Sequence, residues 1–146
     1  MANFVFNVAK GAAAYYATLP GASDSLIVVP IETAGIETDA VLKDYDTLAA
    51  ILAAASNEQT TMGRKTASGV TRTVDDTNDR VDVDIADVLW TAATGNAISK
   101  ILICYKPDSG SADGDIIPLT AHDFVATPNG GDISALVSAT GFYRAS

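Results

Sequence analysis

The sequence contains one cysteine, Cys104, and one histidine, His122, residue types that can act as a nucleophile and a base. Cys104 lies in an apolar stretch without neighbouring cations that would favour a reactive thiolate. His122 directly precedes Asp123, but adjacent side chains on a strand point to opposite faces. We therefore expect Cys104 to be a small buried hydrophobic residue and neither residue to be catalytic. One cysteine also excludes a disulfide within the chain.

A dense group of aspartates is the second candidate for chemistry. Six of them fall within thirteen residues, namely Asp75, Asp76, Asp79, Asp82, Asp84 and Asp87. Carboxylate oxygens are the ligands that Ca²⁺ prefers, but an EF-hand loop starting at Asp75 would place Arg80 at its glycine position and Ala86 at its final carboxylate. We interpret the cluster as a solvated strand face with an Asx-rich turn. A surface Ca²⁺ at an oligomer interface remains an alternative.

Other catalytic patterns are missing from the sequence. It contains neither a Gly-x-Ser-x-Gly nucleophile motif nor a glycine-rich phosphate loop. Arg64, Lys65 and Arg72 are interpreted as cations that meet an acidic partner surface or keep a loop soluble. We predict a protein that is not an enzyme, with no catalytic, cofactor-binding or metal-binding residues. A cell-wall hydrolase is the enzymatic alternative, and it would require paired carboxylates or a metal cluster in a cleft.

Composition narrows the class of partner. The chain has 146 residues and a net charge of −9, from 18 acidic and 9 basic residues. This charge disfavours nucleic acid and anionic membrane surfaces as partners. The longest apolar run, 48–55, is too short to span a bilayer, and the N-terminus lacks the features of a secretory signal. We expect a soluble protein made in a cytoplasm.

Hydrophobic periodicity predicts a mainly β fold with one short α-helix (α+β), organised as a single domain over residues 1–146. We expect a small antiparallel β-sandwich or barrel-like sheet with an N-terminal strand or arm. The predicted strands are 3–8, 26–29, 81–85, 98–105, 115–119, 122–127, 133–137 and 141–144. Because proline lacks a ladder donor, the strand at 26–29 should end at Pro30 or lie at an edge. Trp90 is expected in the core.

The alanine-rich run 48–55 predicts the helix, with Leu48, Ile51 and Leu52 on one face. Asp44 or Asp46 is expected to cap it, because a short carboxylate can accept from free N–H groups of the first turn. The polar segment 57–80 is predicted to be a long loop or irregular arm. Loops of this length are uncommon in compact domains and often bind a partner.

Several stretches together resemble small proteins encoded among the structural genes of tailed bacteriophages. They are 1–11, 42–50, 75–84, 90–93, 100–105, 116–124 and 141–145. The resemblance implies a β-rich virion component, and it assigns no functional residue.

Within that class, we expect a capsid decoration (cement) protein on the outer capsid surface. Its partners would be the major capsid protein and copies of itself, with a trimer favoured by capsid symmetry. Many copies on a lattice gain strength through avidity, so each contact can be modest. The helix and the segment 57–80 are the candidate contacts. The alternative is a neck, tail or fibre component, including a receptor-binding module.

Overall fold

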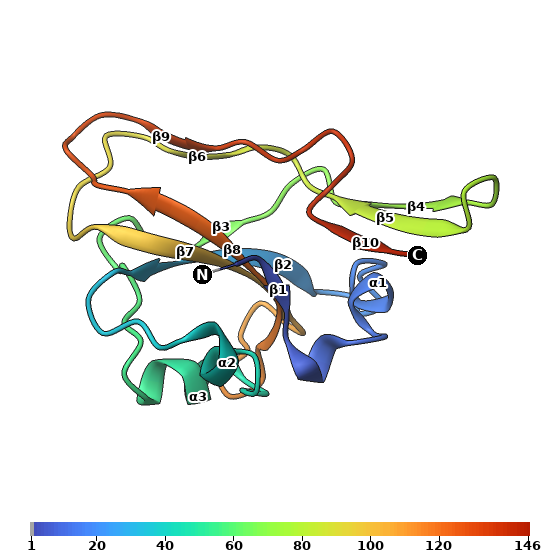
Figure 1. Cartoon of the computed structure of the whole chain (residues 1–146), viewed down its shortest axis with the longest axis horizontal. Coiled ribbons are helices and arrows are strands. Elements are labelled where there is room, and N and C mark those ends of the chain that lie inside the picture. The colour runs from blue at the N-terminus through green and yellow to red at the C-terminus, as the bar shows by residue number, and fades with distance from the viewer. Residues whose placement is uncertain (1) are drawn as a thin grey trace.

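A five-stranded antiparallel sheet forms the centre of the molecule in the computed structural model, which describes residues 2–146 (Figure 1). Its strands follow the order β1-β8-β7-β2-β3. They are β1 (Phe4–Val5), β2 (Ser25–Glu32), β3 (Lys65–Thr66), β7 (Ile98–Lys106) and β8 (Ile117–Ala126). The ribbon β6 (Val88–Trp90) with β9 (Ile133–Ala135), and the sheet β10 (Tyr143–Ala145), β5 (Arg80–Asp84) and β4 (Thr71–Asp75), add further antiparallel pairs. The expected mainly β, antiparallel α+β fold is confirmed.

The central sheet is covered on both faces, which explains why its middle strands β7 and β2 are buried along almost their whole length. Figure 1 shows the β6–β9 ribbon over one face and α2 (Asp39–Leu42) and α3 (Leu48–Ala53) below the other. Trp90 of the ribbon is 2% exposed, and its ring lies 6.5 Å from that of Phe124 on β8. Its indole Nε1 donates to the carbonyl of Gly63 at 2.9 Å. The predicted core position of Trp90 is confirmed.

Short helical turns occupy more of the chain than we expect from the sequence. A 3-10 turn η1 (Asn7–Ala9) and α1 (Ala13–Tyr16) follow β1, so the N-terminal strand is shorter than predicted. The predicted helix corresponds to α3, but the capping prediction was wrong. Thr47 is the N-cap, because its backbone is extended and its side-chain oxygen accepts from the amide of Ala50 at 3.2 Å. Asp44 instead accepts a hydrogen bond from the side chain of Asn7.

Pro30 lies inside β2, which continues to Glu32. Its carbonyl accepts a hydrogen bond from the amide of Gln59 at 2.9 Å, so the backbone of Pro30 faces away from β7. The missing N–H therefore leaves the β2–β7 ladder intact. On that outer side β3 pairs with Ile27 and Val28, and Ile31 forms a bridge with Glu58, so β2 neither ends at Pro30 nor lies at a sheet edge. The prediction of a strand end or an edge was therefore wrong.

The segment 57–80 contains two strands, whereas the sequence predicts an irregular loop. β3 extends the central sheet, and β4 forms a hairpin with β5 through a turn at 76–79. Side chains 71–74 of β4 are exposed on both faces, so the strand carries no alternating apolar signal. Its pairing partner β5 supplies that signal. The hairpin projects from the body of the molecule, as Figure 1 shows.

Two strands predicted separately, 115–119 and 122–127, are one continuous strand, β8. Residues 120–122 between them pair regularly with β7, and the register shifts lie between Ile103 and Cys104 and between Ile98 and Lys100. The buried apolar residues form one cluster that includes Cys104, which is fully buried as expected. Burial raises the pKa of the Cys104 thiol, so the reactive thiolate form is disfavoured.

Candidate interaction surface

The sheet β10-β5-β4, called the arm from here on, extends beyond the central sheet (Figure 1). It joins the hairpin to the last residues of the chain. Opposed residues in its ladders include Val83 with Arg72 and Tyr143, and Asp82 with Thr73 and Arg144. Because side chains alternate along strands, the arm has two chemically different faces. One face carries Arg72, Val74, Val81, Val83, Tyr143 and Ala145, and the other carries Thr71, Thr73, Asp75, Arg80, Asp82, Asp84 and Arg144.

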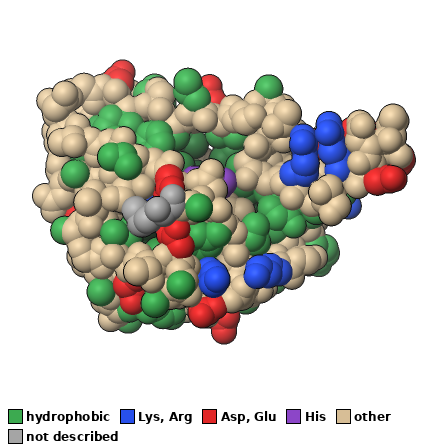
Figure 2. Space-filling view, in the orientation of Figure 1, with side chains coloured by type: hydrophobic (Ala, Val, Ile, Leu, Met, Phe, Trp, Pro, Cys, Tyr) green, Lys and Arg blue, Asp and Glu red, His purple; other side chains and the backbone are tan. Residues whose placement is uncertain are grey.

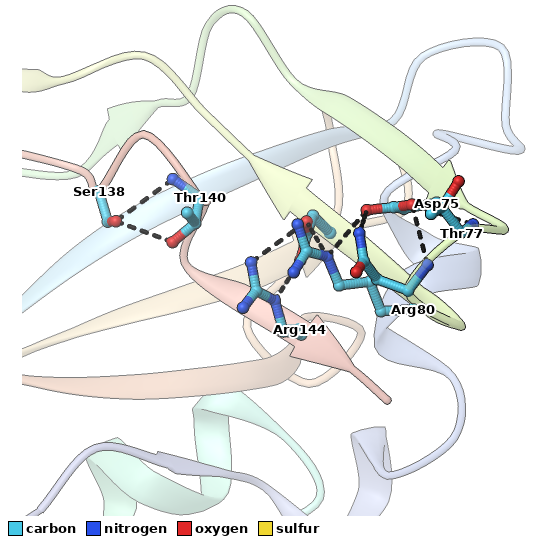
Figure 3. A network of polar contacts seen from close by, with 8 residues as sticks. Asp75, Thr77, Arg80, Ser138, Thr140 and Arg144 are labelled. Carbon is cyan, nitrogen blue, oxygen red and sulfur yellow. Dashed lines mark hydrogen bonds and ion pairs between the residues drawn. The ribbon is translucent and has the colours of Figure 1, made fainter.

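Ion pairs on the charged face connect all three strands of the arm (Figure 3). Arg144 of β10 donates to Asp82 at 2.6 Å, and Nε of Arg80 lies 3.2 Å from the carboxylates of both Asp82 and Asp75. The hydrogen bond from Arg144 lowers the pKa of Asp82. A hydrogen bond from Asn78 lowers the pKa of Asp75. Both carboxylates are therefore ionised at neutral pH and hold the arm in register.

The aspartates of the predicted cluster have local structural roles. Asp75 accepts from the amides of Thr77 and Asn78 at 3.2 Å, which is the predicted Asx turn. Asp87 accepts from the amide of Val137 at 2.7 Å and ties the ribbon to the C-terminal segment. Within residues 2–146, no three side chains of His, Cys, Asp or Glu converge in a group that could hold a metal ion. A Ca²⁺ shared between subunits stays an untested alternative.

The outer edge of β4 presents unpaired backbone groups. The carbonyl of Val83 accepts from the amide of Phe142 at 2.9 Å, so the backbone of Val83 faces β10 and not β4. Arg72 lies opposite Val83, and residues directly opposite in an antiparallel pair share this orientation. The N–H and C=O of Arg72, and by alternation those of Val74, therefore point outward. Such a row is a template for pairing with another chain.

Exposed side chains accompany this edge. Val74 is 52% exposed, and the side chains of residues 71–73 are exposed as well. A shallow hollow of about 390 Å³ is lined by Val74, Val81, Ala145 and the aspartates of the turn. Figure 2 shows basic side chains near the root of the arm and acidic side chains at its end. The arm thus offers an apolar strip between charges of both signs.

A second hollow, called the groove from here on, lies between the β7–β8 face and residues 135–142. Its volume is about 330 Å³, and Figure 2 shows the histidine at its base. It is lined mainly by apolar side chains, among them Ile101, Ile103, Phe124, Leu136 and Phe142. His122 bonds to the hydroxyl of Thr120 at 2.9 Å. Burial, followed by the positive charge of Lys100, lowers the pKa of His122 to about 4, so the imidazole is neutral at neutral pH.

The structure does not assemble His122, Cys104 and Asp123 into a catalytic arrangement. His122 pairs with Ile101 in the β7–β8 ladder, whereas Cys104 pairs with Pro118. The carboxylate of Asp123 contacts Lys100. Their separation follows the alternation of side chains along β8 that the sequence predicts.

Arg64, Lys65 and Arg72 lie apart in the fold and do not act as one patch. Arg64 forms two-pronged contacts with Glu58 and Asp113, at 2.6 to 3.0 Å. Hydrogen bonds to these carboxylates, Glu58 foremost, raise the pKa of Arg64. Lys65 lies on β3 and Arg72 on the arm. Arg64 therefore meets carboxylates of its own chain, while Arg72 is exposed at the β4 edge.

A buried charge cluster around Lys100 is not predicted from the sequence. The side chain of Lys100 is wholly buried and contacts Asp39 and Asp123. The available signal was a lysine inside the mostly apolar strand 98–105. Its carboxylate partners could not be identified because they lie far from it in sequence.

No protein family, curated protein or solved structure matches this chain. No helix within residues 2–146 has the length and apolar character needed to cross a membrane. The arm, the groove and the Lys100 cluster are the structural features that bear on function.

Proposed function

We propose that this protein is a non-enzymatic structural component of a tailed-bacteriophage particle that decorates the outer capsid surface as a cement protein. The arm is the observation that carries the proposal. It combines an unpaired strand edge, an exposed valine and charges of both signs on an element that extends from the body. Its partners are the major capsid protein and copies of the same chain, with a trimer favoured.

A thin projecting sheet such as the arm gains stability from a partner. Small isolated β-ribbons are marginally stable because they bury little apolar surface. Natural proteins usually shield long exposed edges, because such edges pair with other chains. The arm is instead reinforced by its ion pairs and left open at β4. Contact with a neighbouring subunit would pair the edge and cover Val74.

The remaining support comes from charge, size and resemblance. A net charge of −9 keeps many copies soluble at high concentration. Stretches along the chain resemble tailed-phage structural proteins. Among these stretches, 75–84 and 141–145 lie in the arm, and 100–105 lies in β7. Repetition on a symmetric lattice allows a small contact of this kind to hold through avidity.

Val74→Asp tests the arm directly, with Val125→Asp as the matched control. Val125 is 82% exposed on β8, outside the arm, so both changes place a carboxylate at an exposed strand valine. Binding is measured by co-sedimentation with capsids of the same phage assembled without this protein. We expect Val74→Asp to weaken binding about tenfold or more, equivalent to about 1.4 kcal/mol, and Val125→Asp to bind normally.

The opposite pattern, with only Val125→Asp impaired, would move the contact away from the arm. No binding of the unaltered protein to capsids, together with binding to necks, tails or fibres, would replace the cement role with the alternative location.

A further inference from the structure

The buried side chain of Lys100 contacts two partly exposed carboxylates. Its Nζ contacts Oδ1 of Asp123, its direct neighbour across the β7–β8 ladder, and lies 3.2 Å from Oδ1 of Asp39 on α2. The ring of Phe4 lies 5.4 Å from Nζ. The carbonyl of Ala2 accepts from Nζ at 3.2 Å. An amine is thus held against one carboxyl group while a second carboxylate faces it.

The N-terminal segment binds the carboxylate of Asp39 and the backbone of Asp123. Oδ2 of Asp39 accepts from the amide of Ala2 at 2.6 Å, and the amide of Asp123 donates to the side chain of Asn3 at 2.7 Å. Oδ1 of Asp39 is buried and accepts no hydrogen bond of good geometry, so it is free to take a proton from the amine beside it. The reacting groups are therefore held in place by contacts from several elements.

We propose that Lys100 and Asp123 condense to an isopeptide bond that joins β7 to β8, with Asp39 carrying the proton. Every other ion pair described within residues 2–146 uses arginine, whose guanidinium is a poor nucleophile. Lys100 is also the lysine whose side chain is wholly buried. The combination of amine, carboxyl group and second carboxylate occurs here alone among these pairs.

The reaction balances without an external reagent. The Lys100 ammonium transfers one proton to Oδ1 of Asp39, and the freed amine attacks Cγ of Asp123. The C–N bond forms while one C–O bond of Asp123 breaks. The departing oxygen takes the proton held by Asp39 and a second proton from the nitrogen, and it leaves as water. One ammonium and one carboxylate become a neutral amide plus water, and Asp39 returns to its starting state.

Two physical effects favour this product. The Lys100 ammonium is wholly buried, which is costly, and a neutral amide removes this buried charge. Fixing the amine against the carboxyl group also replaces a bimolecular condensation by an intramolecular one, for which effective concentrations are very high. The side chain of Asp123 is 34% exposed, which leaves an exit for the released water.

Burial acts to raise the pKa of Asp39, but the hydrogen bond from Ala2 and the adjacent Lys100 ammonium outweigh burial and keep the pKa below its ordinary value. Asp39 is therefore ionised in the resting cluster. This is the state in which it can accept a proton from the ammonium.

Intact mass of the purified, denatured full chain tests the proposal. We expect the unaltered protein to lack the mass of one water, and Lys100→Arg and Asp39→Asn to keep their full mass. Lys100→Arg preserves the buried cation, and Asp39→Asn preserves the side-chain shape. Circular dichroism checks that both variants fold. Protease digestion should yield a branched peptide that links position 100 to position 123.

Three results would overturn the proposal in whole or in part. A full-mass unaltered protein excludes the bond. A water loss that persists in Lys100→Arg assigns it to another site, such as cyclisation at Asp113-Gly114. A branched peptide that still forms fully in Asp39→Asn removes the proton-carrying role of Asp39.

Discussion

The buried imidazole of His122 makes the stability of the molecule depend on pH. Burial, the largest cause, lowers its pKa from 6.5 to about 4 in the folded protein. At pH values between about 4 and 6.5, His122 therefore binds a proton in the unfolded chain but not in the folded protein. Stability should fall as pH decreases from about 6.5 to about 4, by up to about 3 kcal/mol from this group.

Urea unfolding at pH 7, 5.5 and 4.5 measures this effect, with His122→Gln as the comparison. The variant should lose much of the pH dependence in this window, because glutamine does not titrate. The carboxylates Asp39, Asp75, Asp82 and Asp113 have lowered pKa values, so their stabilising contribution is lost only as pH falls below about 4. Equal pH dependence in the two proteins would show that His122 does not cause it.

Single residues also show where sequence reasoning is strongest. The burial of Cys104 and Trp90 follows from apolar character alone, and both predictions are confirmed. The Lys100 cluster depends on a helix and a strand meeting the same side chain across the fold. No local sequence pattern predicts these contacts between Lys100 and its carboxylates, so only the structure reveals them.

At the level of elements, the joint between the body and β10 depends on Gly141. Its φ is +87°, and the turn before it is closed by hydrogen bonds between Ser138 and Thr140 (Figure 3). A Cβ at this position would lie 2.2 Å from the carbonyl oxygen of Val83. That carbonyl is the acceptor that attaches β10 to β5.

Gly141→Ala should therefore destabilise the arm more than Gly130→Ala does. Gly130 has a φ of +90°, but a Cβ at that position would meet no neighbouring atom within 4 Å, so only the backbone cost of about 1–2 kcal/mol applies there. We expect about 2–4 kcal/mol for Gly141→Ala, because the steric clash adds to that cost. Chemical denaturation gives the two values, and hydrogen exchange on β5 should report loss of β10. Equal costs would mean that the β10 joint accommodates the Cβ.

The elements differ in how well the sequence predicts them. Strand β7 is evident because six of its nine residues are apolar, and all but the last residue are buried. Strand β4 is not evident from the sequence, because its exposed Thr, Arg and Val residues show no alternation of apolar and polar side chains. Its strand structure comes from pairing with β5. The N-cap of α3 was misassigned because aspartate and threonine are both good caps, and only the extended backbone of Thr47 distinguishes them.

On the scale of the whole molecule, the central sheet with its covering ribbon and helices forms a layered body, and the arm projects from it. The buried apolar residues form a cluster around the central sheet, whereas the arm is held by strand pairing, ion pairs, the buried side chain of Val83 and contacts with α1. Such an element gains most from a neighbour that covers it. A symmetric array of copies on a capsid supplies that neighbour at every site, and this is the basis of the proposed cement role.

A cryo-electron reconstruction of the phage particle that encodes this chain tests the cement role most directly. We predict density that fits the fold, repeated over the outer capsid lattice, with the arm in contact with the capsid or with a second copy. Density confined to the neck, tail or fibres, or a particle without this protein, would contradict the cement role.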